Sequence, residues 1–172
     1  MSRLEQIWRK RQEIPDPQVR DAADQFESAR KLLDAQPDSG LLLPLMNTAA
    51  IAIELYLKCL SAEKVYTDSG EGWSKISAKP AIHCHVLTTL LDEVGGDVER
   101  KLDAFRAGYP AFRDLSFRDA LKQCEGVFEE SRYPFEPGGN LSKYPLNLLM
   151  ACSRLLEQFV AKLRTRETIQ HA

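Results

Sequence analysis

Residues 49–60, AAIAIELYLKCL, constrain the fold of this chain more than any other stretch. Ten of these twelve residues are apolar, and the two exceptions, Glu54 and Lys58, lie four positions apart. A helix that is apolar nearly all round is packed on several sides. We therefore expect a central helix over residues 41–64, which tolerates Pro44 because a proline is allowed in the first helical turn.

The rest of the chain carries repeated helix signals and no convincing run of alternating, β-branched strand residues. The sequence therefore predicts an all-α fold. A chain of 172 residues is long enough to bury one good core, so we expect a single helical domain over residues 1–172.

Helix start and stop signals divide the chain into further elements. Two N-terminal helices are expected within residues 1–36: a short one over 3–13, and one over 16–35 that Asp16 caps and Pro17 begins. Residues 65–80 are rich in Gly, Ser and Lys and are expected to form a surface loop. Later helices are expected over residues 80–95, 97–107, 116–130 and 142–163.

Composition and charge exclude several classes of protein. The net charge of -2 gives no general attraction to phosphate, which argues against indiscriminate nucleic-acid binding. No segment approaches the roughly 18 uninterrupted apolar residues of a membrane span, and the N-terminus does not resemble a secretory signal. We expect a cytoplasmic protein without a membrane partner, whose four scattered cysteines are free thiols.

Glu54 and Lys58 raise the question of why two charges lie in an apolar helix. They could form an i,i+4 ion pair on a narrow exposed strip, which would contribute about 0.2–0.5 kcal/mol. Alternatively the pair faces a semi-buried cleft, where other polar groups must meet the charges because an unpaired buried charge is costly. The second interpretation predicts partners elsewhere in the chain.

Four other residues are candidates for such a cleft. Asn47 lies two helical turns before Glu54, on the same face. His85 begins the amphipathic segment HVLTTLL, although it could equally be a capping or core histidine. Arg132, in the turn SRYPF, could bind Glu54 with both arms of its guanidinium or be an ordinary surface arginine. Tyr133 could pack its ring and add a hydroxyl to the same cluster.

Three segments in order, NTAAIAIELYLKCL, HVLTTLL and SRYPFEPG, resemble the HEPN (higher eukaryotes and prokaryotes nucleotide-binding) domain superfamily. The likeness spans about residues 41–163 and rests on the order of three short motifs in an all-α context. It implies an antiparallel helical bundle with additional short helices and frequent homodimerisation. It also implies roles in RNA processing, toxin–antitoxin systems or defence.

The sequence departs from the superfamily at its nuclease motif. Catalytic members cleave RNA with an Arg-x(4–6)-His motif near the start of the final core helix. After Arg132 the positions that would hold the histidine are Pro137, Gly138 and Gly139. The usual acid–base group is therefore missing, and metal-independent RNA cleavage by that route is not expected.

Other chemistry has weaker support. Arg164 and Arg166 precede His171 with the nuclease spacing, but they end the chain, where fraying is normal. His83, Cys84 and His85 lack the spacing of a metal site, and no glycine-rich phosphate loop is present. We expect neither a metal nor a cofactor, and no catalytic residue is assigned.

Three hypotheses follow. The first is a binding module in which Asn47, Glu54, Lys58, His85, Arg132 and Tyr133 line a cleft for RNA or a nucleotide. The second is an interaction protein, a homodimer or the companion of a partner protein, in which the same cluster only fixes helix packing. The third is a ribonuclease that uses His85 or His171 with Arg132.

Overall fold

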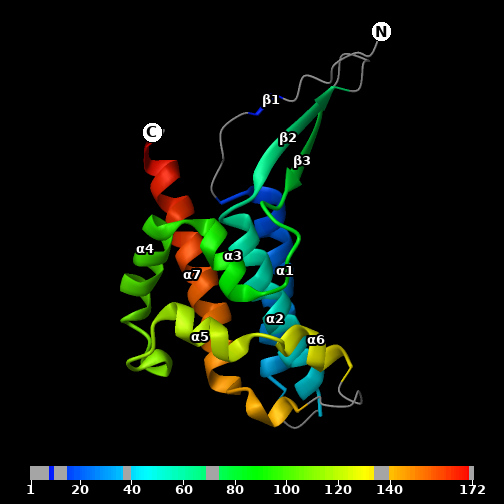
Figure 1. Cartoon of the computed structure of the whole chain (residues 1–172), viewed down its shortest axis with the longest axis vertical. Coiled ribbons are helices and arrows are strands. Elements are labelled where there is room, and N and C mark those ends of the chain that lie inside the picture. The colour runs from blue at the N-terminus through cyan, green and yellow to red at the C-terminus, as the bar shows by residue number, and fades with distance from the viewer. Residues whose placement is uncertain (1–7, 10–14, 37–39, 69–73, 134–139, 171–172) are drawn as a thin grey trace.

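The structure is a computed structural model, and it describes residues 8–9, 15–36, 40–68, 74–133 and 140–170 (Figure 1). Its elements follow one another as β1 (Trp8–Arg9), α1 (Pro17–Asp34), α2 (Leu42–Cys59), β2 (Glu63–Asp68), β3 (Ser74–Lys79), α3 (Leu87–Val94), α4 (Gly96–Arg106), η2 (Pro110–Phe112), α5 (Phe117–Cys124), α6 (Val127–Arg132), η3 (Leu141–Lys143) and α7 (Leu146–Gln170). The expected all-α fold class is confirmed, with one small sheet added to it.

Three long helices, α1, α2 and α7, form the centre of the molecule (Figure 1). The backbone N–H of Asp16, before α1, donates to the carbonyl of Cys59 at the end of α2, at 2.8 Å. Leu33, Leu45 and Leu146 line one cavity at the other end. Helix α1 therefore runs antiparallel to both α2 and α7, whereas α2 and α7 run in the same direction.

Helix α2 is the central helix that the apolar stretch predicts. Its buried side chains come from every face of the helix, and they are Met46, Ala49, Ala50, Ala52, Ile53, Glu54, Tyr56, Leu57 and Cys59. By length and composition alone α2 could also cross a membrane, but a core helix packed on several sides meets the same criterion. The helix ends at Cys59, earlier than the expected residue 64.

The start of α1 follows directly from its sequence. Asp16 Oδ1 accepts hydrogen bonds from the backbone N–H groups of Gln18 and Val19, both at 3.0 Å, and Pro17 occupies the first helical position. A side-chain cap satisfies N–H groups that have no partner within the helix, and proline loses nothing there because it has no N–H. The predicted cap is confirmed.

Residues 65–80 correct the prediction of a surface loop. They form most of an antiparallel hairpin, β2 and β3, in which Tyr66 pairs with Ile76. Trp8 and Arg9, expected in a short helix over residues 3–13, form β1 and pair with β2, and the rest of that segment lies outside the described residues. Gly, Ser and Lys content suggested a loop, but β-branched and aromatic residues within it favour a strand. The hairpin projects from the helical body (Figure 1).

Three later boundaries also differ from prediction. The helix expected over residues 80–95 is α3, which begins only at Leu87. The single helix expected over residues 116–130 is two helices, α5 and α6, because Gly126 adopts a positive φ of 82° between them. The last helix begins at Leu146 rather than at Ser142, because Asn140 first caps the short helix η3 by accepting from the Ser142 backbone N–H. Helix α6, which follows the break at Gly126, packs against α2.

Candidate functional site

Glu54 on α2 is buried, with 8% of its surface exposed. Lys58 Nζ lies 2.6 Å from its Oε1, and His85 Nδ1 lies 3.1 Å from Oε1 and 3.0 Å from Oε2. The exposed-strip interpretation therefore does not describe this pair. The carboxylate is semi-buried and is met from outside its own helix, by the histidine that precedes α3.

His85 connects this ion pair to the surface. Its side chain is 57% exposed, and its ring stacks on Phe128 of α6, with centroids 5.5 Å apart and planes 26° apart. Aromatic pairs of this kind add about 0.5–1.5 kcal/mol beyond the area that they bury. The imidazole is thus held on one edge by Glu54 and on one face by Phe128.

Arg132 takes a different place from the one that we expected. The predicted contact with Glu54 is absent among the described contacts of both residues. The guanidinium instead lies 5.2 Å from the ring centroids of both Phe128 and Tyr133, and it donates to the Tyr133 hydroxyl at 3.3 Å. Arg132 is the last residue of α6, so its side chain lies beside the ring of Phe128, one turn earlier, and not over α2.

Asn47 lies below this surface and joins α2 to α6. Its Nδ2 donates to the Ser131 hydroxyl at 3.1 Å and to the Phe128 carbonyl at 3.4 Å. These bonds hold the helix that carries Phe128 and Arg132. Asn47 is therefore placed to support the site and not to line it.

The six predicted residues thus divide into two layers. Glu54 and Lys58 form an inner ion pair, and Asn47 supports α6 from within. The outer layer consists of His85, Arg132 and Tyr133 with Phe128, which the sequence did not single out, and we call these four residues the ring surface. The three described cavities are lined by other residues, and the side chains of His85, Arg132 and Tyr133 are exposed. Whether these residues bind a ligand stays a prediction.

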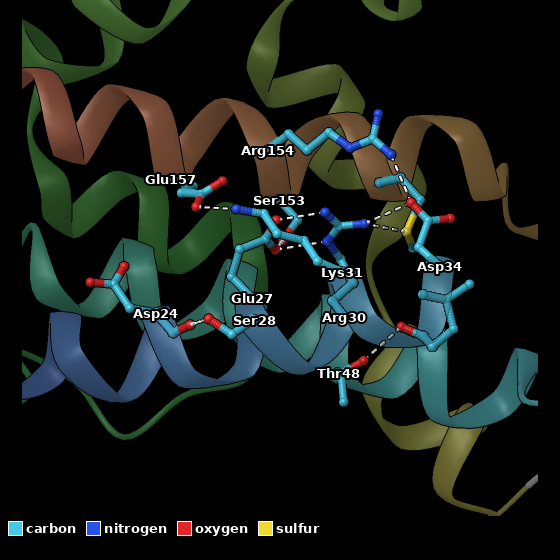
Figure 2. A network of polar contacts seen from close by, with 12 residues as sticks. Asp24, Glu27, Ser28, Arg30, Lys31, Asp34, Thr48, Ser153, Arg154 and Glu157 are labelled. Carbon is cyan, nitrogen blue, oxygen red and sulfur yellow. Dashed lines mark hydrogen bonds and ion pairs between the residues drawn. The ribbon is translucent and has the colours of Figure 1, made fainter. Parts of the chain in front are cut away.

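A second polar cluster, between α1 and α7, was not predicted (Figure 2). Glu27 and Arg30 are each 1% exposed. Arg30 Nε and Nη2 donate to the two carboxylate oxygens of Glu27, at 2.8 and 2.7 Å, and the Ser153 hydroxyl donates to Glu27 Oε2 at 2.5 Å. Ala23, Glu27 and Arg30 recur at the spacing of one helix face, which could have shown that two charges lie on the buried side of α1.

The cluster continues to the surface at one end. Asp34 Oδ2 accepts from Arg30 Nη1 at 3.2 Å and from Arg154 Nη2 at 2.8 Å (Figure 2). Burial alone would lower the pKa of Arg30, but the hydrogen bonds and charges of Glu27 and Asp34 outweigh it, so that its pKa is raised. Every group is satisfied within the cluster, which favours a role in packing α1 on α7.

Potential nucleophiles in the core are held in their neutral forms. Burial raises the pKa of the Cys59 thiol, and burial together with the hydrogen bond to Asp24 raises the pKa of Tyr56. A thiol must ionise to act as a nucleophile or a metal ligand. Among the described residues, His, Cys, Asp and Glu side chains form no group of three or more that could hold a metal ion.

Comparison of the chain with protein-family models, with curated proteins and with solved structures gives no match. The resemblance to the HEPN superfamily therefore stays a prediction that rests on the three sequence motifs.

Proposed function

We propose that this protein is a binding module that takes RNA or a nucleotide on the ring surface. The observation that carries the proposal is the position of Arg132, whose guanidinium lies 5.2 Å from the centroids of two aromatic rings. This arginine forms no ion pair with any described residue, so its charge is available to a phosphate.

The chemistry of the ring surface suits an unpaired nucleotide. Proteins that bind single-stranded nucleic acid stack bases on aromatic rings and guanidinium planes and pair the phosphates with basic side chains. Tyr133 and His85 are 43% and 57% exposed, which leaves ring area for such stacking. The charges of Glu54 and Lys58 neutralise each other beneath the ring surface, and the hydrogen bond to Glu54 holds His85 in position.

Binding without cleavage is the form of this proposal that the sequence supports. Residues 137–139, where the superfamily's histidine would stand, are Pro, Gly and Gly, and they lie outside the described residues. His171 also lies outside them, and so do the side chains of Arg164 and Arg166. Membership of the HEPN superfamily would agree with this function and is proposed with it.

The proposal is tested by the affinity of the protein for a fluorescent single-stranded RNA, measured by anisotropy at several salt concentrations. We expect Arg132→Gln to weaken binding of every RNA sequence and to reduce the salt slope by about 1, because one phosphate contact is lost. We expect Tyr133→Ala to weaken binding by about 1–3 kcal/mol through the loss of one stacked base. Arg100→Gln, on the exposed side of α4, is the matched control and should bind like the wild type.

A wild-type protein that binds neither RNA nor mononucleotides at low salt would contradict the proposal. Binding that falls equally in Arg132→Gln and Arg100→Gln would also contradict it, because the attraction would then be nonspecific. Melting temperatures of all three variants should stay close to that of the wild type, since the substituted residues are exposed.

A second candidate function is that of a homodimeric interaction protein, and one observation favours it. Leu32 on α1 and Leu42 and Leu43 on α2 are exposed, and their helix ends lie at the same end of the molecule. Exposed large apolar side chains that gather in one region mark interaction surfaces. Sedimentation of the wild type and of Leu42→Glu tests this candidate: a dimer that the variant converts to monomer supports it, and a monomeric wild type excludes it.

A further inference from the structure

A cavity of about 250 Å³ lies between α4 and α7, away from the ring surface. It is lined by Lys101, Ala104, Phe105, Phe159, Lys162 and Leu163. These residues come from one face of each helix, and the two helices lie side by side in Figure 1.

Aromatic rings give the cavity a fixed apolar wall. Phe105 and Phe159 meet edge to face, with centroids 5.8 Å apart and planes 63° apart. Tyr109 packs on Phe105, with ring centroids 6.0 Å apart, and the Tyr109 hydroxyl donates to Gln158. Rings that are held by other rings keep their positions, so the apolar wall is preformed.

The charged groups of the cavity are both cations. Lys162 Nζ lies 5.1 Å from the Phe105 centroid, over the aromatic wall, and Lys101 lies on the α4 side. Neither lysine forms an ion pair with any described residue. With no acidic partner among the described side chains, an ammonium beside an apolar cavity attracts an anion.

The acidic residues of α4 do not neutralise these lysines because they bind elsewhere. Asp97 pairs with Arg100, Glu99 pairs with Arg118 of α5, and Asp103 pairs with Arg106 and accepts from the Phe117 backbone N–H at 2.8 Å. The face of α4 that meets α7 is thus apolar and basic, and the carboxylates of α4 pair with arginines outside the cavity.

We propose that this cavity binds a small aryl carboxylate, with the ring against Phe105 and Phe159 and the carboxylate between Lys101 and Lys162. The volume is below the roughly 300–1,000 Å³ of pockets for drug-sized ligands, which excludes a folded peptide or a dinucleotide. The apolar walls provide burial for the ring, and the lysines select an anion over a neutral analogue.

The proposal is tested by calorimetric titration of the full chain with 3-phenylpropanoate and with its neutral amide. The wild type should bind the carboxylate about tenfold more tightly than the amide, because only the carboxylate pairs with the two lysines. Lys101→Gln/Lys162→Gln should bind the two compounds equally. Lys122→Gln, an exposed lysine of α5, should keep the tenfold preference.

A second variant tests the cavity itself. Ala104 is exposed at the cavity wall, so Ala104→Phe should fill the cavity, abolish binding of both compounds and leave the fold intact by circular dichroism. The proposal is overturned if the wild type shows no saturable binding at millimolar concentrations, if it binds the amide as tightly as the carboxylate, or if Ala104→Phe binds like the wild type.

Discussion

Two acid–base pairs of this protein lie below its surface, and their surroundings differ at the level of single residues. Glu27 and Arg30 are closed off between α1 and α7, and Ser153 completes the hydrogen bonding of the carboxylate. Glu54 is buried but is bound by His85, whose ring reaches solvent. The first pair is thus placed to specify packing, whereas the second links the core to an exposed surface.

The closed pair gives the first prediction. Arg30→Met leaves the Glu27 carboxylate buried without its counter-charge, so the free energy of unfolding should fall by about 3–5 kcal/mol. Replacing both partners, as Glu27→Leu/Arg30→Met, should restore most of that loss, because no charge is then left unpaired. Urea unfolding measures each value.

Lys31→Met is the matched control for this prediction. It breaks the more exposed pair between Lys31 and Glu157, one position along α1, and should change the free energy of unfolding by only about 0–1 kcal/mol. If Arg30→Met were no more destabilising than Lys31→Met, Arg30 would not be buried as described.

The buried thiol of Cys59 gives a prediction about alkaline pH. Burial raises its pKa above the ordinary value near 9.0, so above about pH 9 the unfolded chain loses a proton that the folded chain keeps. The free energy of unfolding is therefore unaffected by this group below pH 9 and falls above it, by at most about 1.4 kcal/mol per pH unit. In Cys59→Ala the free energy of unfolding should therefore fall less steeply between pH 9 and pH 11, by up to about 1.4 kcal/mol per pH unit. A slope equal to that of the wild type would show that the thiol ionises freely in the folded protein.

At the scale of elements, the helices that carry local signals were predicted well. The cap at Asp16 and the proline at Pro17 specify the start of α1, and both act within one helical turn. The hairpin was missed because its stability depends on backbone pairing between separate strands: β2 pairs with β3, with Tyr66 opposite Ile76, and β1 pairs with β2. Such pairing depends on tertiary context, which composition does not reveal.

The break between α5 and α6 gives a prediction at this scale. Gly126 has a φ of 82°, and a Cβ there would lie 2.7 Å from the Tyr144 hydroxyl oxygen. Gly126→Ala should lower the free energy of unfolding by about 2–3 kcal/mol, because it adds left-handed strain and displaces the hydroxyl that donates to Glu130 at 2.9 Å. Urea unfolding measures the loss.

Gly96→Ala is the control for that experiment. No heavy atom lies within 4 Å of a Cβ built at Gly96, and its φ is not positive. Alanine at such a position should be neutral or stabilising by up to about 1 kcal/mol. Equal losses in the two variants would contradict the special role of Gly126.

For the molecule as a whole, the sequence located the candidate site better than it assigned the contacts there. The burial of Glu54 followed from the apolar helix around it, and a partner from elsewhere was expected. The sequence could not show whether His85 or Arg132 would be that partner, because several elements separate both residues from Glu54. The packing of those elements places the His85 ring on Glu54 and the Arg132 guanidinium beside Phe128. Phe128 was missed because a single phenylalanine in a helix gives no sign of which residues will stack on it.

The distribution of cysteines tests the packing of the whole molecule. Cys59, Cys124 and Cys152 are buried on α2, α5 and α7, and Cys84 alone of the four thiols is partly exposed. A disulfide reagent added to the native protein should therefore modify one thiol rapidly and the other three only as fast as the core opens. Cys84→Ser should remove the rapid phase and leave the slow phase unchanged. Rapid reaction of Cys124 or Cys152 in that variant would mean that α5 separates from α7 far more readily than a packed core allows, since their thiols lie together between those helices.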